Sequence, residues 1–104
     1  MAHRQDEAGY FVISVAARLL NVHPQTLRYY ERAGLIQPSR SRGNIRLYSA
    51  TDLQRAQYIK RLIEDLGVNL AGVDVIMRLM ERVKQLEEDN EGLRRATPRP
   101  DGPS

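Results

Sequence analysis

The side chains best suited to chemistry lie in residues 24–61, where arginine is concentrated beside tyrosine and glutamine. A guanidinium carries a permanent charge and a fork of donors that matches phosphate oxygens and the edge of a guanine base. Residues 1–23 hold two basic and two acidic side chains, 24–61 hold eight and two, and 62–104 hold six and nine, giving nets of 0, +6 and −3. The net positive charge is concentrated in residues 24–61, which indicates a surface that binds nucleic-acid phosphates.

A short helix is predicted over residues 24–33. Pro24 suits the first turn of a helix, and Gly34 suits the position after its end. At about 100° per residue, one side of this helix faces outward and the other packs. The outward set is Gln25, Arg28, Tyr29 and Arg32, and the inward set is Leu27, Tyr30 and Ala33.

An earlier helix is predicted over residues 14–20, after a short aromatic and β-branched run at 10–13. Ser14 can cap it, and its apolar side is formed by Val15, Leu19 and Leu20. Residues 21–23 form the turn to the next helix. The pair is a helix-turn-helix pattern, in which the second helix enters the major groove of DNA.

A wing is predicted to follow. Leu35 and Ile36 make a strand-like step, residues 38–44 form a loop with arginines and the Gly43-Asn44 turn pair, and residues 45–48 alternate as a returning strand. Arginines on such a loop can lie along the DNA backbone or enter a minor groove.

Two further helices are predicted. The first covers 49–67, is capped by Ser49 or Thr51 and ends at Gly67, with a buried stripe of Leu53, Ala56, Ile59, Leu62, Ile63 and Leu66. The second covers 69–95, with Asn69 as cap. It carries a heptad seam of Ile76, Leu79, Val83, Leu86, Asn90 and Leu93, which predicts a dimeric coiled coil; packing within one chain is the alternative. The flanking charges fit either strand orientation.

Composition narrows the function classes. There is no cysteine, and His3 and His23 have no partner at ligand spacing, so neither a metal site nor another cofactor is expected. The carboxylates form no catalytic grouping, which disfavours an enzyme. No apolar run of transmembrane length occurs, so we expect a cytoplasmic protein without a membrane role. Residues 1–9 are expected to be flexible, and 96–104, with three of the five prolines, disordered.

The order of these parts resembles the MerR family of bacterial transcriptional regulators, over about residues 11–70. The similarity is carried by 27–31 (LRYYE), 34–36 (GLI), Pro38, 46–49 (RLYS) and 52–53 (DL). Residues 23–28 (HPQTLR) and 67–73 (GVNLAGV) are similar to the heat-shock repressor branch, HspR. The resemblance implies a mainly α fold: a winged helix-turn-helix domain at 10–68 and a C-terminal dimerisation helix at 69–95.

The resemblance also implies DNA contacts by Arg28, Tyr30, Arg46 and the loop arginines, with Gln25 near the bases. It favours Tyr30 where helical phase favours Tyr29. Many family members have a wing tyrosine where this chain has Ile45, so the contact made by that tyrosine is not carried over. This chain also has neither a ligand domain nor the cysteines of metal sensors, so no small-molecule or metal effector is expected. The full candidate contact set is Gln25, Thr26, Arg28, Tyr29, Tyr30, Arg32, Arg40, Arg42, Asn44, Arg46 and Tyr48.

The leading hypothesis is a homodimeric repressor of heat-shock genes that binds an inverted-repeat operator in double-stranded DNA. Through the resemblance, the DnaK chaperone is a candidate co-repressor, and direct sensing of heat is the alternative. Two other functions stay open: an activator that distorts promoter DNA, and a coiled-coil adaptor that does not bind DNA. The charge distribution argues against the adaptor.

Overall fold

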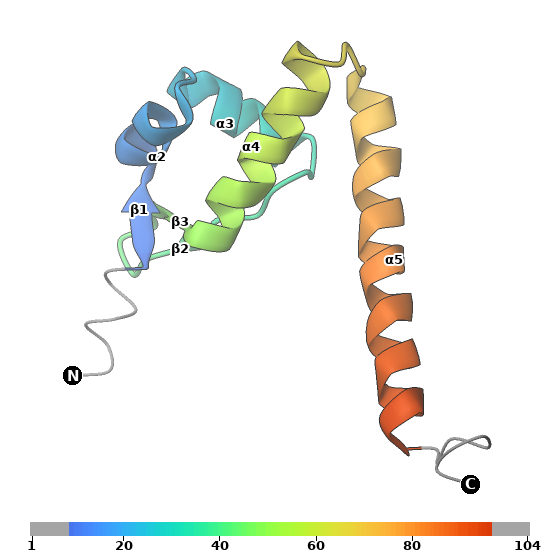
Figure 1. Ribbon diagram of the computed structural model, residues 1–104. Coiled ribbons are helices and arrows are strands. Elements are labelled where there is room, and N and C mark those ends of the chain that lie inside the picture. Colours follow the sequence, from blue (N-terminus) through green and yellow to red (C-terminus); the bar gives the residue numbers. More distant parts are fainter. Residues whose placement is uncertain (1–8, 97–104) are drawn as a thin grey trace, which may run out of the picture. The chain divides into compact units, whose positions relative to one another are not determined.

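A computed structural model describes residues 9–96 of the 104-residue chain. The predicted fold class is confirmed: the described chain is mainly α-helical, with a small sheet and a long C-terminal helix (Figure 1). It divides into two units between Asn69 and Leu70. In chain order the elements are β1 (Tyr10–Val12), α2 (Ile13–Leu20), α3 (Pro24–Arg32), β2 (Ser39–Arg40), β3 (Arg46–Ser49), α4 (Ala50–Glu64) and α5 (Leu70–Ala96).

The sheet has three antiparallel strands in the order β1-β3-β2. The strand β3 is central, with Phe11 opposite Tyr48 on one side and Arg40 opposite Arg46 on the other. The sequence predicted the returning strand but not its pairing with residues 10–12. The step at Leu35 and Ile36 is not a strand: both residues are buried in the segment between α3 and β2, and the first wing strand begins only at Ser39.

The helix-turn-helix is formed by α2 and α3. The turn begins at Asn21, whose φ of 58° places it in the left-handed region that asparagine tolerates. Its N–H and that of Val22 return to carbonyls of the last turn of α2. Ser14 does not cap α2, because the helix begins one residue earlier with Val12 at its N-cap and no side-chain cap bond. Beyond α3, Gly34 has a φ of 78°, so the expected helix stop is confirmed.

The helix α4 begins at a capping box. Ser49 Oγ accepts from the N–H of Asp52 at 3.0 Å, and the Asp52 carboxylate accepts from the N–H of Ser49 at 2.9 Å. This arrangement satisfies donors that the first turn of a helix leaves unpaired. Two basic side chains of α4 reach other segments, since Lys60 donates to the carbonyl of Leu20 at 3.0 Å and Arg55 to that of Leu35 at 2.6 Å.

The core of the first unit contains apolar side chains from α2, α3 and α4, the segment after α3, and β3. Two residues of the predicted apolar faces are exposed instead: Leu19 at 60% and Leu66 at 71%. In α2 the buried positions are taken by Ala16, Ala17 and Leu20, which turns Leu19 outward. Leu66 lies beyond the end of α4, so helical phase no longer fixes its direction. The buried set is Ala16, Ala17, Leu20, Leu27, Tyr30, Leu35, Ile36, Tyr48, Ala56, Ile59 and Leu62.

The second unit is the 27-residue helix α5. At 1.5 Å per residue it is about 40 Å long. Its apolar side chains at Leu79, Val83, Leu86 and Leu93 are between 49% and 65% exposed. Within residues 9–96, no helix is both long and apolar enough to cross a membrane. Residues 1–8, with His3, and most of the tail predicted at 96–104 lie outside the described part of the chain.

Candidate nucleic-acid interface

The helix α3 has the two faces that its sequence predicts. Leu27 is fully buried and Tyr30 is 3% exposed, whereas Tyr29 is 45% exposed. Gln25 and Arg32 are exposed, and Thr26 and Arg28 are partly exposed. Helical phase therefore placed both tyrosines correctly, and a row of polar and basic side chains is available to a ligand along the outer face of α3.

The first turn of α3 is organised by His23 and Pro24. His23 is the N-cap, and its Nδ1 accepts a hydrogen bond from the N–H of Gln25 at 3.1 Å. Pro24 occupies the first helical position, where it has no N–H to leave unpaired. Together, the His23 cap and Pro24 close the first turn of α3, while the Gln25 side chain is exposed. The positive end of a helix dipole also favours an approaching anion.

The loop between β2 and β3 is held by Ser41. Its N–H donates to the carbonyl of Ile45 at 2.9 Å, and its Oγ accepts from the N–H of Ile45 at 3.2 Å. The N–H of Asn44 donates to the carbonyl of Ser41 at 2.9 Å, and Asn44 adopts a φ of 65°. The loop is thus a defined turn that exposes Arg42, Asn44 and Ile45.

Glu31 joins α3 to both strands of the wing. Its carboxylate accepts from Nε of Arg46 on β3 at 2.6 Å and from a terminal nitrogen of Arg40 on β2 at 3.4 Å. The hydrogen bond to Glu31 raises the pKa of the Arg46 guanidinium, against an opposing effect of burial. Sequence reasoning did not single out Glu31; the available signal was one carboxylate on a helix otherwise rich in basic side chains.

Tyr48 is a core residue, which corrects its place in the predicted contact set. Its side chain is fully buried, and within the described residues its hydroxyl has no hydrogen-bond partner. Burial raises the pKa of this hydroxyl and the charge of Glu31 adds to the increase, whereas Arg46, Arg28 and Arg40 oppose it.

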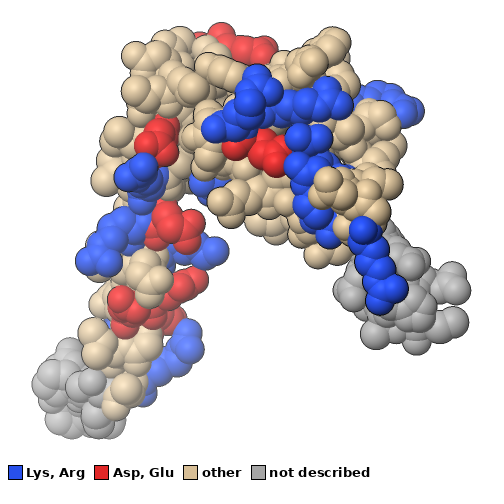
Figure 2. Space-filling model, turned by 180° about the vertical axis from the view of Figure 1, so that it is seen from behind, with Lys and Arg blue, Asp and Glu red and all other residues tan. Residues whose placement is uncertain are grey.

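The charges have different distributions in the two units. Figure 2 shows Lys and Arg side chains gathered on one face of the unit formed by residues 9–69, around a smaller acidic area, whereas basic and acidic side chains are interleaved along α5. A polyanion such as DNA would bind the first kind of surface. Among the described residues, no three His, Cys, Asp or Glu side chains are placed to hold a metal ion.

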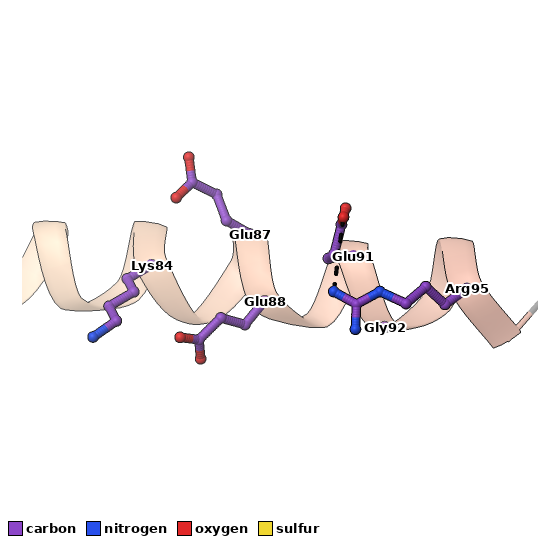
Figure 3. A pocket seen from close by; sticks show the side chains of 6 residues that line it. All are labelled: Lys84, Glu87, Glu88, Glu91, Gly92 and Arg95. Atoms are coloured by element: carbon purple, nitrogen blue, oxygen red, sulfur yellow. Dashed lines mark ion pairs between the residues drawn. The ribbon is translucent and has the colours of Figure 1, made fainter.

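A shallow hollow on α5 does not form a comparable site. It is lined by side chains of that one helix, and the carboxylate of Glu91 pairs with Arg95 at 3.8 Å across it (Figure 3). Such exposed pairs have little energetic effect. Its lining residues are Lys84, Glu87, Glu88, Glu91, Gly92 and Arg95.

Comparison with known proteins identifies the class of this interface. The sequence profile described as MerR HTH family regulatory protein matches residues 11–80. The chain belongs to the MerR family. It is therefore a DNA-binding transcriptional regulator, and its family consists of regulators rather than enzymes.

Individual MerR relatives add detail. The chain is 44% identical over 82 residues to the "Putative heat shock protein HspR" of Streptomyces coelicolor, a match that covers 79% of this chain and 54% of that protein. It thus spans about half the length of that relative. It is 34% identical over 95 residues to the transcriptional regulator GlnR of Bacillus anthracis, covering 88% of this chain and 73% of GlnR.

A solved MerR structure shares the fold. The structure of HiNmlR, described as a MerR family regulator lacking the sensor domain and bound to promoter DNA, superimposes with a TM-score of 0.64. The match has 20% sequence identity and covers 81% of this chain and 70% of HiNmlR. At that identity the likeness concerns the fold alone.

Proposed function

We propose that this chain is a homodimeric repressor of heat-shock genes that binds an inverted-repeat operator. The observation that carries the proposal is the 44% identity over 82 residues to the protein named for HspR. This identity is higher than the 34% over 95 residues to GlnR, which makes the heat-shock branch a better candidate than that relative. The sign of regulation rests on this likeness, and an activator is the alternative.

In this proposal α3 enters the major groove, with Arg28 and Gln25 near base edges. Arginine forms its most specific base contact with two acceptors of guanine, and glutamine with adenine. The partial exposure of Arg28 and the exposure of Gln25 allow such contacts. Arg32, Tyr29 and Thr26 then lie where they can contact the flanking backbone, whereas Tyr30, at 3% exposure, belongs to the core as Tyr48 does.

The wing would contact the DNA backbone or an adjacent minor groove. Arg42 and Asn44 are exposed at its tip, and Arg40 and Arg46 lie at its base. Each phosphate neutralised by an arginine releases counterions, so affinity falls as salt rises. The exposed apolar side chain of Ile45, at 54%, would lie at the same tip.

Dimerisation through α5 would bring a second copy of α3 and the wing to the other half of the inverted repeat. The heptad seam consists of Ile76, Leu79, Val83, Leu86, Asn90 and Leu93. About half or more of the surface is exposed at four of these side chains, Leu79, Val83, Leu86 and Leu93. An exposed apolar stripe of this kind favours a partner helix. A polar Asn90 inside the seam would select the register or the oligomeric state.

Two inputs are compatible with this reading. In one, DnaK stabilises the DNA-competent state of the repressor and leaves when unfolded proteins compete for it. In the other, the short coiled coil melts on warming and the dimer releases DNA directly. We favour the first, on the strength of the family resemblance.

The experiment is to map the sites that the purified protein protects in the DNA of its own genome. Protected inverted repeats upstream of chaperone genes, with lower transcription in vitro when the protein is added, support the proposal. Higher transcription identifies an activator, and protection elsewhere contradicts the heat-shock assignment. Operator binding is then followed across a temperature ramp with and without DnaK. Heat-induced release that DnaK does not alter contradicts the co-repressor form, and full resistance to heat without DnaK contradicts the intrinsic form.

A further inference from the structure

The ion pairs of Glu31 link α3 to the wing, the two parts of the proposed DNA interface. Glu31 lies on α3, while Arg46 and Arg40 lie on the two strands of the wing. The side chains of Glu31, Arg46 and Arg40 are 24%, 27% and 39% exposed, so the contacts are partly shielded from water. Partial shielding strengthens an ion pair relative to a fully solvated one. The spacing between recognition helix and wing is therefore fixed through this carboxylate.

The two arginines are held differently. Arg46 uses only Nε to reach Glu31, and within the described residues its two terminal nitrogens have no acceptor. Arg40 uses one terminal nitrogen for Glu31 and the other for the carbonyl of Asn44 at 3.1 Å. An arginine anchored through Nε keeps its outer edge available to a phosphate. Arg46 is thus oriented with free donors, whereas Arg40 is engaged within the protein.

We infer that Glu31 is a specificity-determining residue: it fixes Arg46 for one phosphate at a set distance from α3 and keeps Arg40 from binding phosphates freely. This inference rests on the proposed operator binding. A carboxylate is also a negative charge beside the DNA, so it opposes binding to any duplex. On the operator this cost is offset, because a preorganised helix and wing meet base edges and phosphates together. On other DNA no base contacts offset it.

Loss of Glu31 should therefore change the ratio of operator affinity to affinity for unrelated DNA, and not only the affinity for the operator. Without the charge of Glu31, both arginines can turn toward phosphates in any register, which increases binding to unrelated DNA. At the same time the wing loses its fixed spacing from α3, which weakens the operator complex. A residue needed only for folding would instead weaken both complexes alike.

The test is Glu31→Gln, measured by titration of the operator duplex and a scrambled duplex of equal length. Glu81→Gln is the matched control, because it removes the same charge from the exposed side of α5 opposite the heptad seam. We expect the ratio of operator to scrambled affinity to fall on the order of tenfold in Glu31→Gln, as for a coupled charge network, and to be unchanged in Glu81→Gln. Equal losses on both duplexes, equal gains on both, or no change would each overturn the inference.

Two further variants separate the contributions. Glu31→Asp keeps the charge but shortens the reach, so it should keep weak binding to scrambled DNA and lose operator affinity. In the background of Arg46→Gln, Glu31→Gln should cause little further loss on the operator, because its positioning effect acts through Arg46. If Glu31→Gln lowers operator affinity in the Arg46→Gln background as much as it does in the wild type, Glu31 does not act through Arg46. A wild-type protein that does not prefer its operator contradicts the proposed function itself, which distinguishes that failure from one confined to Glu31.

Discussion

The Nζ of Lys60 lies 3.0 Å from the carbonyl oxygen of Leu20, so a cation from α4 caps the end of α2. Leu20 is the last residue of α2, where helix carbonyls have no partner within the helix. A positive charge at this end also opposes the negative end of the helix dipole. The turn that leads into α3 begins at the next residue, so this hydrogen bond ties α4 to the start of the turn between α2 and α3.

Lys60→Met should therefore reduce the stability of the first unit. The substitution keeps most of the side-chain length but removes the donor, leaving a partly buried carbonyl unpaired. We expect a loss of about 1–2 kcal/mol in the free energy of unfolding, the range for a partly shielded hydrogen bond to a charged group. Urea unfolding measures it. Lys84→Met, at the only other lysine and exposed on α5, should change the value by much less.

Arg28 should discriminate between DNA sequences. Arg28→Ala is expected to weaken operator binding by about 1–3 kcal/mol if the guanidinium contacts a base. Arg28→Lys keeps the charge but not the two-pronged geometry, so it should lose nearly as much on the operator and little on scrambled DNA. Equal losses on both duplexes in the alanine variant would show a phosphate contact, and unchanged affinity would remove Arg28 from the interface.

Local features of the sequence predicted most of the fold. Pro24, Gly34 and Ser49 act within one helical turn, so the limits of α3 and the start of α4 could be deduced from neighbouring residues. The burial of Leu27 follows from helical phase in the same way. Leu19 could not be assigned correctly, because the pattern does not show that Ala16 and Ala17 provide the close-packed face.

The wing contacts depend on pairs that are distant in the sequence. Glu31 meets Arg40 nine residues away and Arg46 fifteen residues away, and only the folded hairpin brings them together. The burial of Tyr48 has the same origin, since α2, from an earlier part of the sequence, packs on β3 together with α4. Alternation within residues 45–48 predicted a strand but not which residue faces the core.

Dimerisation should depend on the heptad seam of α5. Leu79→Glu with Leu86→Glu places charges among exposed apolar residues that are 59% and 49% accessible in the single chain. Desolvating such charges in a helix interface is costly, so we expect monomers with weak operator binding. Glu81→Lys with Glu88→Lys, on the opposite side of the same helix, is the control. Sedimentation measures the oligomeric state of both variants. A dimer that persists in the leucine variant would place the interface elsewhere.

Alkaline pH should destabilise the first unit through its two buried tyrosines. Burial raises the pKa of Tyr30 and of Tyr48 above the ordinary value of 10.0. Above pH 10.0 the unfolded chain loses protons that the folded chain keeps, so stability falls as pH rises from 10.0 through the folded pKa. Well below pH 10.0 both tyrosines are protonated in the folded and the unfolded chain, so their contribution to stability is fully present and does not vary with pH. Urea unfolding at a series of pH values, with tyrosinate absorbance as a second signal, measures the decline.

Tyr48→Phe tests the origin of this decline. The variant removes one of the two titrating groups, so its stability should fall less steeply above pH 10.0 than that of the wild type. Near neutral pH it should be as stable or more stable, because the hydroxyl of Tyr48 is buried without a partner in the described part of the chain. Tyr29→Phe, at a side chain that is 45% exposed, is the matched control and should follow the wild type. A marked loss of stability in Tyr48→Phe at neutral pH would show that the hydroxyl has a partner in solution.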